Sequence, residues 1–301
     1  MTFKLRNCPK MTFRIFIFCI FISCSFQCIA EDKIALLFLT RSTPNHADVW
    51  KKLLKEAPGK YNVYVHSKEP MGDAFFQKRR ISNIVSTTWS IHVKAWQALL
   101  QEAVKDKDNV QFAFLSEACI PLHSLKHIYS IITRDPRTHI AFARPWWDSN
   151  NPRELHTIDK EFRWGNAEWM VLNRKHAELV ASDRAVIRLV SRHENDQESY
   201  FATLFAIHGC LFDDLCAHSY TYVNWNNATN GGASPYSFTD VSNFNDALLD
   251  EAYNGGALFA RKFSKEYPSE DILQMIENSK LVSLRADPKE SMTQNLSLET
   301  H

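Results

Sequence analysis

The stretch VQFAFLSEACIPL, residues 110–122, runs from an apolar strand into a short polar loop and ends in Cys-Ile-Pro. Buried strands of this composition belong to α/β sheets, and ligands of such sheets bind just beyond the carboxyl ends of the strands. Residues 116–118 are therefore a candidate floor for a ligand. The plainer alternative is that Ser116 and Glu117 only open a turn and that Pro121 stops the strand.

Strands and helices alternate on both sides of this stretch. Apolar runs predict strands at residues 34–40, 61–67 and near Ile84, and helical spacing predicts helices at 47–57 and 93–104. This order is typical of a nucleotide-binding α/β half. The remainder predicts helices at 125–133, from Asn173, at 196–208 and at 243–252, and strands at 139–145, 219–225 and 258–263.

The polar residues 146–160 interrupt this pattern. They form a stretch that is long for a plain connection in a folded domain. Such a length favours a segment that faces the substrate.

The composition is that of a folded protein. The chain has 301 residues, of which 45% are hydrophobic and eight are tryptophan, so it can bury a sizeable core in one large α/β domain or two small ones. A net charge of +1 gives no sign of a surface for polyanions. Nucleic acid is therefore not an expected partner.

The N-terminus has the pattern of a secretory targeting segment. Four basic residues between positions 4 and 14 precede the apolar run IFIFCIFISCSFQCIA at residues 15–30. At about 16 residues, this run is shorter than the roughly 20 that span a bilayer comfortably. Cleavage after Ala30 thus competes with retention as a short signal anchor, which is slightly favoured. Lipidation at Cys24 is a third alternative and needs a bacterial source.

The cysteines point to neither a disulfide scaffold nor a metal site. Three of them, Cys119, Cys210 and Cys216, lie outside the targeting segment, and one bridge between Cys210 and Cys216 is conceivable in an oxidising lumen. No CxxC, HExxH or His-rich motif is present, so no metal is expected.

Glu198 is the candidate general base. It lies in the first turn of the predicted helix 196–208, where the helix dipole favours an ionised carboxylate. Such a group at a cleft can accept the proton of an attacking alcohol. The alternative is an exposed acid that only complements the helix dipole.

Cations and polar side chains follow three of the predicted strands. Arg261 and Lys262 follow an apolar strand and precede Phe263, and two adjacent cations at a strand end suit a diphosphate. The alternative interpretation is that these two cations are only solvated charges on the surface. The first two strands end in side chains at the positions where a nucleotide would lie, namely Thr40, Arg41, His66 and Lys68.

Together these segments resemble the core-2/I-branching family of glycosyltransferases, including its plant and microbial members and its xylosyltransferase relatives. The resemblance covers residues 33–267 in order and spacing. It is carried by KIALLFLTR, YNVYVHSKEP, the Trp89 segment with VKAWQALLQEA, FAFLSEACIPL, RWGNAEWMVLNRKHAELV, DQESYFAT, TYVNW and LFARKF.

The resemblance implies the fold class and the organisation of the chain. The expected fold is α/β, a single-domain A-type glycosyltransferase fold with a Rossmann-like mixed sheet flanked by helices. We expect a signal peptide or short signal anchor at 1–30, a glycosyltransferase domain at 31–286 and a polar tail at 287–301. If the source is a eukaryote, we expect a protein of the secretory pathway that is a single-pass type II protein of the Golgi membrane. In any other source, we expect an exported or membrane-anchored protein.

The resemblance also implies the chemistry. The expected reaction is inverting and metal-independent, with N-acetylglucosamine favoured as the sugar that moves from a UDP-sugar donor to a glycan or glycoprotein acceptor. Glu198 falls on the position of the catalytic base and Lys262 on the lysine of the closing motif. The other expected donor-binding residues are Arg261, Thr40, Arg41, His66, Lys68, Trp89, Ser116 and Glu117.

Trp164, Glu168 and Trp169 are the expected acceptor wall, with a buried aromatic strand as the alternative. One departure concerns a second phosphate-binding arginine of the animal members, where this chain reads SPYSFTD at 234–240. Either Arg261 substitutes for it or donor binding is weakened. Transfer of xylose or glucuronic acid, or a secreted sugar-binding protein without turnover, are the rival functions.

Overall fold

Strand β1, Lys33–Thr40, lies at the centre of the parallel part of the main sheet. The computed structural model describes residues 31–285 apart from 213 and 233, so the predicted targeting segment and the polar tail lie outside it. Strand β1 pairs in parallel with β2, Tyr61–Ser67, and with β3, Asn109–Ser116. Residues 34–38 have no exposed surface, because both faces of the strand are covered.

The other half of this sheet is mixed. Strand β8, Val171–Asn173, runs antiparallel to β3 and to β5, Thr138–His139, and β5 pairs in parallel with β9, Leu215–Cys216. The full order is β2-β1-β3-β8-β5-β9. The predicted α/β fold with a Rossmann-like mixed sheet is confirmed, and the described residues form one compact unit.

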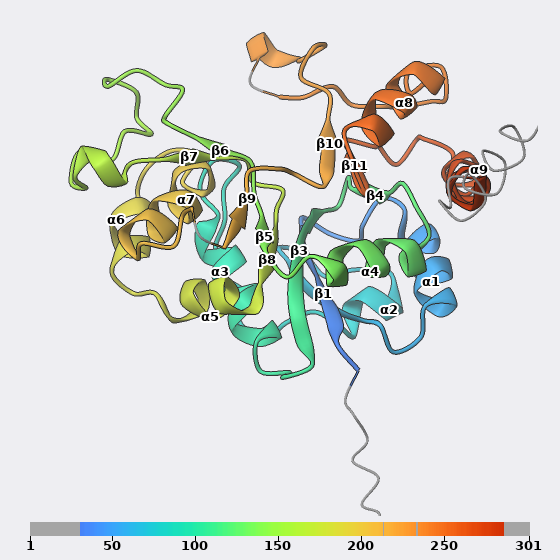
Figure 1. Cartoon of the computed structure of the whole chain (residues 1–301), viewed down its shortest axis with the longest axis horizontal. Coiled ribbons are helices and arrows are strands. Elements are labelled where there is room, and N and C mark those ends of the chain that lie inside the picture. The colour runs from blue at the N-terminus through green and yellow to red at the C-terminus, as the bar shows by residue number, and fades with distance from the viewer. Residues whose placement is uncertain (1–30, 213, 233, 286–301) are drawn as a thin grey trace, which may run out of the picture. The chain divides into compact units, whose positions relative to one another are not determined.

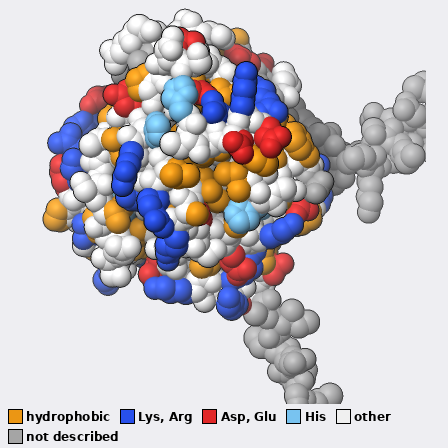
Figure 2. All heavy atoms as spheres, turned by 90° about the vertical axis from the view of Figure 1, so that its left-hand side faces the viewer, with side chains coloured by type: hydrophobic (Ala, Val, Ile, Leu, Met, Phe, Trp, Pro, Cys, Tyr) orange, Lys and Arg blue, Asp and Glu red, His pale blue; other side chains and the backbone are white. Residues whose placement is uncertain are grey.

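Helices cover both faces of the sheet (Figure 1). One side carries α1, Ala47–Glu56, α2, Ala74–Gln77, and α4, Leu125–Arg134. The other carries α3, Val93–Ala103, α5, Arg174–Ser182, α6, Val186–Val190, and α7, Gln197–Ile207. Figure 2 looks onto this second side, where apolar side chains gather near the middle of the surface between groups of basic ones.

Aromatic rings fill the two layers between sheet and helices. On one face, Phe38 contacts Trp50 of α1 with ring centroids 5.1 Å apart. On the opposite face, Phe114 contacts Trp96 of α3 at 4.5 Å and Phe201 of α7 at 5.4 Å. Phe114 pairs with Leu37, the residue before Phe38, so the alternation of side chains along β1 directs Phe38 to the opposite face.

Two smaller sheets surround the carboxyl ends of the parallel strands. Strand β11, Phe259–Arg261, lies between β10, Thr221–Val223, and β4, Ile120–Pro121. A separate hairpin joins β6, Phe142–Ala143, to β7, Gly165–Asn166. The remaining elements are the 3-10 turns Lys160–Phe162 and Asn230–Gly232 and the helices α8, Asp246–Asn254, and α9, Ser269–Arg285.

Several predicted elements differ from the structure. The strand expected near Ile84 is absent, because the backbone amide of Val85 donates to His66 Nε2 at 3.0 Å instead of to a neighbouring strand. Pro121 does not end the sheet contacts but lies in β4. The strand expected at 139–145 is divided between β5 and β6, which belong to different sheets.

No disulfide joins Cys210 to Cys216. Cys210 follows α7 and its Sγ approaches the carbonyl oxygen of Phe205 at 3.5 Å, whereas Cys216 lies in β9. Within residues 31–285, with 213 and 233 left aside, no helix has both the length and the apolar character needed to cross a bilayer.

We predict that Phe114→Ala lowers the free energy of unfolding by about 3–5 kcal/mol, the usual loss for a large aromatic side chain in a packed core. The ring is 1% exposed and lies between two helices. Phe212→Ala is the matched control, since Phe212 is 70% exposed, and it should change stability by less than about 0.5 kcal/mol. Urea unfolding curves of both variants measure the difference, and equal losses would contradict the assigned core.

Candidate functional site

The carboxyl ends of the three parallel strands meet at one edge of the main sheet. Thr40 pairs with Ser67 and Leu39 with Ser116. A cleft of about 1080 Å³ opens there, at the position where α/β sheets bind ligands. The predicted site residues that line it are Thr40, Arg41, Lys68, Trp89, Ser116, Glu117, Glu168, Trp169, Glu198, Arg261 and Lys262.

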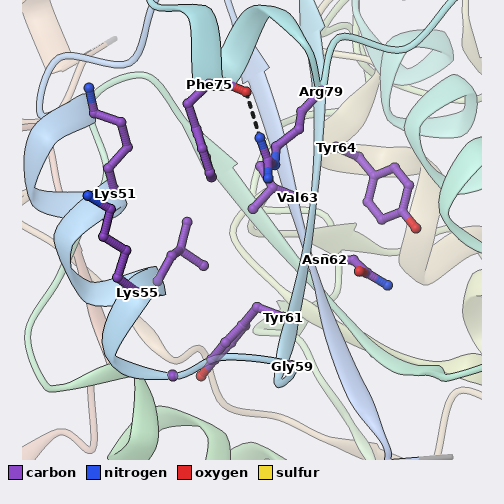
Figure 3. Close-up of a pocket in the computed structure, with 11 residues that line it drawn as sticks. Lys51, Lys55, Gly59, Tyr61, Asn62, Val63, Tyr64, Phe75 and Arg79 are labelled. Atoms are coloured by element: carbon purple, nitrogen blue, oxygen red, sulfur yellow. Dashed lines mark hydrogen bonds between the residues drawn. The ribbon is translucent and has the colours of Figure 1, made fainter.

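A second cavity, of about 640 Å³, lies between α1, α2 and the outer edge of β2 (Figure 3). Lys51 of this cavity already pairs with Asp48 at 2.8 Å and with Asp73 at 2.6 Å. None of the residues predicted to act on a substrate lines it. The larger cleft is therefore the candidate site.

Glu117, the one acid in the loop after β3, connects two strand ends at the floor of the cleft. Glu117 Oε2 accepts a hydrogen bond of 2.6 Å from the backbone amide of Arg41, which ties the end of β3 to the end of β1. The Arg41 side chain turns to Glu69, 3.1 Å away. Among the described residues no group of three or more histidine, cysteine, aspartate or glutamate side chains could hold a metal.

Arg261 and Lys262 enter the cleft from the end of β11. The Arg261 guanidinium lies 3.9 Å over the ring of Trp169, and its buried Nε has no hydrogen-bond partner in the described structure. Burial lowers the pKa of Arg261, while the charges of Cys119, Glu168 and Glu117 oppose that shift. Lys262 Nζ donates to Ser234 Oγ at 2.7 Å.

The pKa of Lys262 is lowered as well, first by burial and then by the charge of Arg261. Two cations thus lie side by side in a partly desolvated cleft, where an anion would be attracted more strongly than in water. Their pairing with acids is weak, because no carboxylate of the described residues lies within ion-pair distance of either one.

Glu198 lies in the first turn of α7, and 26% of its side chain is exposed. Its Oε2 is 2.9 Å from Arg153 Nη1, yet that oxygen accepts no directed hydrogen bond, so the contact is ionic. Burial raises the pKa of Glu198, the charge of Arg153 opposes the shift, and the charge of Glu168 adds to it. The carboxylate is therefore more basic than an exposed glutamate.

Arg153 is held in place by Asn195. With the Asn195 amide turned so that its oxygen faces the guanidinium, that oxygen accepts from Nε and Nη2 at 2.9 Å each. Asn195 adopts a left-handed backbone with φ of 50° immediately before α7. This forked contact to the side-chain oxygen of Asn195 fixes Arg153 beside the Glu198 carboxylate.

Glu168 lies deeper in the cleft. Its Oε1 accepts hydrogen bonds from His92 Nε2 at 2.7 Å and from Trp96 Nε1 at 2.9 Å. Burial would raise the pKa of Glu168, but the charge and hydrogen bond of His92 hold it below the ordinary value. Glu168 is therefore a buried, ionised group that acts on its neighbours by charge.

Two predicted residues lie elsewhere. His66 has no exposed surface, and burial lowers its pKa; its ring accepts from Val85 and supports the segment before α3. Trp164 packs 5.5 Å from Phe212 with the Arg144 guanidinium 4.0 Å over its ring. Neither side chain lines the cleft.

The cleft also contains residues that were not named as site residues from the sequence, namely His92, Trp146, Arg153, Asn195 and Trp225. The polar stretch 146–160 was predicted to face the substrate, and it does supply Trp146 and Arg153. No spacing rule links either residue to Glu198.

The family was decided by comparison with known sequences. A sequence model described as "Branch: Core-2/I-Branching enzyme" matches residues 34–251, which is more than half of the chain. This chain belongs to the Core-2/I-Branching enzyme family. Membership confirms the resemblance seen in the sequence and places the chain among glycosyltransferases.

One curated relative in this family is Glycosyltransferase BC10 of Oryza sativa subsp. japonica. It is 27% identical over 230 residues, which cover 64% of this chain and 57% of BC10. The chain therefore spans less than two thirds of the length of that relative.

Two solved structures are also similar to this Core-2/I-Branching family member. One is a glycosyltransferase involved in the glycosylation of the major capsid of PBCV-1, with 13% identity, a TM-score of 0.39 and coverage of 76% of this chain and 94% of that one. The other is A197 from STIV, with 12% identity, a TM-score of 0.26 and coverage of 51% and 70%. At these TM-scores neither adds to the fold described above.

Proposed function

We propose that this chain is an inverting glycosyltransferase that moves a sugar, with N-acetylglucosamine as our first assignment, from a UDP-sugar to a hydroxyl of a glycan. The observation that carries the proposal is the placement of Glu198 and the pair Arg261 and Lys262 on one cleft. A base and a diphosphate site in the same cleft are what a displacement at an anomeric carbon requires. Membership of the family supports a sugar donor and a glycan acceptor.

Glu198 acts as the general base in this reaction. The acceptor oxygen forms a bond to the anomeric carbon while its proton passes to Glu198, and the bond from that carbon to the UDP oxygen breaks. Burial makes the carboxylate more basic, and Arg153 holds it ionised. Attack from the side opposite UDP inverts the configuration of the anomeric carbon.

Arg261 and Lys262 stabilise the leaving diphosphate. Negative charge grows on UDP as the bond breaks, and fixed cations in a partly desolvated cleft stabilise that charge without reorganising. We assign the contact with a phosphate oxygen to the guanidinium of Arg261, which lines the cleft. Because these cations supply the positive charge, the proposed reaction needs no metal ion.

Glu168 and Trp169 belong to the base of the cleft rather than to an open acceptor wall. Trp169 is only 7% exposed, and its ring supports Arg261. We assign to Glu168 a second role, as an acceptor of hydrogen bonds from a sugar hydroxyl through its other oxygen. Trp164 has no role in this proposal.

We predict that Glu198→Gln keeps UDP binding while turnover falls by roughly two to four orders of magnitude, the usual contribution of a general base. The amide preserves the shape of the side chain and cannot take the proton. Release of UDP is measured with UDP-N-acetylglucosamine, UDP-xylose and UDP-glucuronic acid against a panel of oligosaccharides, and NMR of the wild-type product gives the anomeric configuration. Near-normal turnover of the variant would remove Glu198 from this role, and a retained configuration would exclude the inverting mechanism.

We predict that Lys262→Ala loses UDP binding and turnover together, and that Arg261→Ala weakens UDP binding by about 1.5–3 kcal/mol, the range for a hydrogen bond to a charged group. Calorimetric titration of UDP in the presence of EDTA measures both, after thermal unfolding has shown that each variant is folded. Lys55→Ala is the matched control, because Lys55 lines only the second cavity. Binding that disappears on adding EDTA, or unchanged binding in both variants, would contradict the assignment.

We predict that Arg153→Ala moves the acidic limb of the pH profile of kcat/KM to higher pH. Glu198 must be ionised to work, and burial already raises its pKa; Arg153 and His92 lower it, while Glu168 raises it. Removing the Arg153 cation therefore raises that pKa further, so protonation inhibits at a higher pH. Arg144→Ala is the control, since Arg144 has the same charge and lies outside the cleft; equal shifts in the two variants would contradict the pairing.

A further inference from the structure

The loop between β6 and β7 presents an exposed aromatic ring to the cleft. Trp146 has 55% of its surface exposed and lines the cleft. A large apolar surface left open in a binding cleft is a sign of a ligand contact. Trp89 and Trp225, which are 68% and 53% exposed, also line this cleft, and Trp146 differs from them by its close contact with Gly165.

The ring of Trp146 rests on Gly165. A Cβ atom added at Gly165 would lie 2.5 Å from Cζ3 of Trp146, which is far inside contact distance. Only glycine therefore leaves room for the indole at this position of β7. The ring is seated against backbone, and its remaining surface is open to the cleft.

The neighbouring tryptophan anchors the loop. Trp147 meets Trp146 edge-on, with centroids 5.0 Å apart and the planes at 75°. Its Nε1 donates to Glu154 Oε2 at 3.1 Å, and Glu154 Oε1 accepts from Arg163 Nη1 at 2.6 Å. Trp147 is thus held by partly buried polar contacts and packs beside Trp146, whose ring we call the platform.

Strand β7, on which the Trp146 platform rests, is bonded to α7, the helix that carries the proposed general base Glu198. Asn166, the residue after Gly165, donates through Nδ2 to the carbonyl of Gln197 at 2.9 Å and accepts through Oδ1 from the amide of Ala202 at 3.1 Å. These two bonds attach β7 to α7 on either side of Glu198. Figure 1 shows that β11, which carries Arg261, lies apart from the β6–β7 hairpin, so we assign the platform to the acceptor side.

We propose that Trp146 forms a second sugar subsite, in which its indole stacks on the apolar C–H face of the pyranose next to the sugar that is modified. The ligand class is a neutral oligosaccharide of β-linked hexopyranoses, whose ring faces carry contiguous C–H groups. Aromatic rings bind such faces through apolar contact with a defined geometry. This subsite rests on the function proposed above and adds that the preferred acceptor has at least two sugar units.

The test compares acceptors that differ by one sugar, namely the p-nitrophenyl β-galactoside and β-glucoside and the corresponding galactobioside and cellobioside. The wild type should show a KM for one of the disaccharides that is roughly tenfold lower than for its monosaccharide, which corresponds to about 1.4 kcal/mol. Trp146→Ala should remove that preference, and Trp146→Phe should keep most of it. Gly165→Ala should weaken it through displacement of the ring.

Phe212→Ala provides the control, because it also removes an exposed aromatic ring, and Phe212 lies outside the cleft. Equal KM values for mono- and disaccharides in the wild type would overturn the subsite, as would a preference that survives in Trp146→Ala. If Trp146→Ala raised the KM of the UDP-sugar equally with every acceptor, the ring would lie at the donor. That result would also overturn the proposed subsite. Absence of transfer to any acceptor combined with absence of UDP release would contradict the proposed function itself.

Discussion

The site depends on the antiparallel pairing of β11 with β4. Ala260 pairs with Ile120, and beyond the strand the amide of Phe263 donates to the carbonyl of Ala118 at 2.9 Å. These backbone contacts place Arg261 directly beside the loop that ends β3. Burial of a guanidinium costs several kcal/mol unless nearby groups compensate. The ring of Trp169 and the charge of Glu168 provide that compensation.

A second set of contacts joins the two helices behind the cleft. Asp196, the residue before α7, accepts from the backbone amides of His92 and Val93 at 2.9 and 3.1 Å and so caps α3. His92 in turn donates to Glu168. The carboxylate of Glu198, two residues after Asp196, is therefore fixed to the same framework that positions Glu168, and the cleft needs no large rearrangement to bring its charges together.

Local patterns in the sequence were enough to predict much of the framework. Most of the predicted strands and helices have an apolar pattern of their own, and Glu198 and Lys262 were predicted as site residues because each lies at the end of an element. The strand expected near Ile84 failed because a buried histidine, His66, takes the amide of Val85. That contact joins two segments distant in the chain, and no local pattern encodes it.

Contacts between distant segments explain why the residues of the cleft differ from the predicted site residues. Arg153 meets Glu198 only because the β6–β7 hairpin folds over α7. Trp164 and Trp146 are both aromatic residues near that hairpin, and the sequence does not indicate which of them faces the cleft. The indole of Trp146 packs against Gly165, and this contact depends on the position of the β7 backbone.

The isolation of the β6–β7 hairpin has a consequence for how this site can diversify. Among the described strands β6 and β7 pair with each other and with no strand of the main sheet. Insertions or deletions between them would therefore leave the register of β1, β2 and β3 intact. On the proposed placement of Trp146, exchange of this segment between homologues would change the selectivity for the glycan, and it would also replace Arg153 beside Glu198.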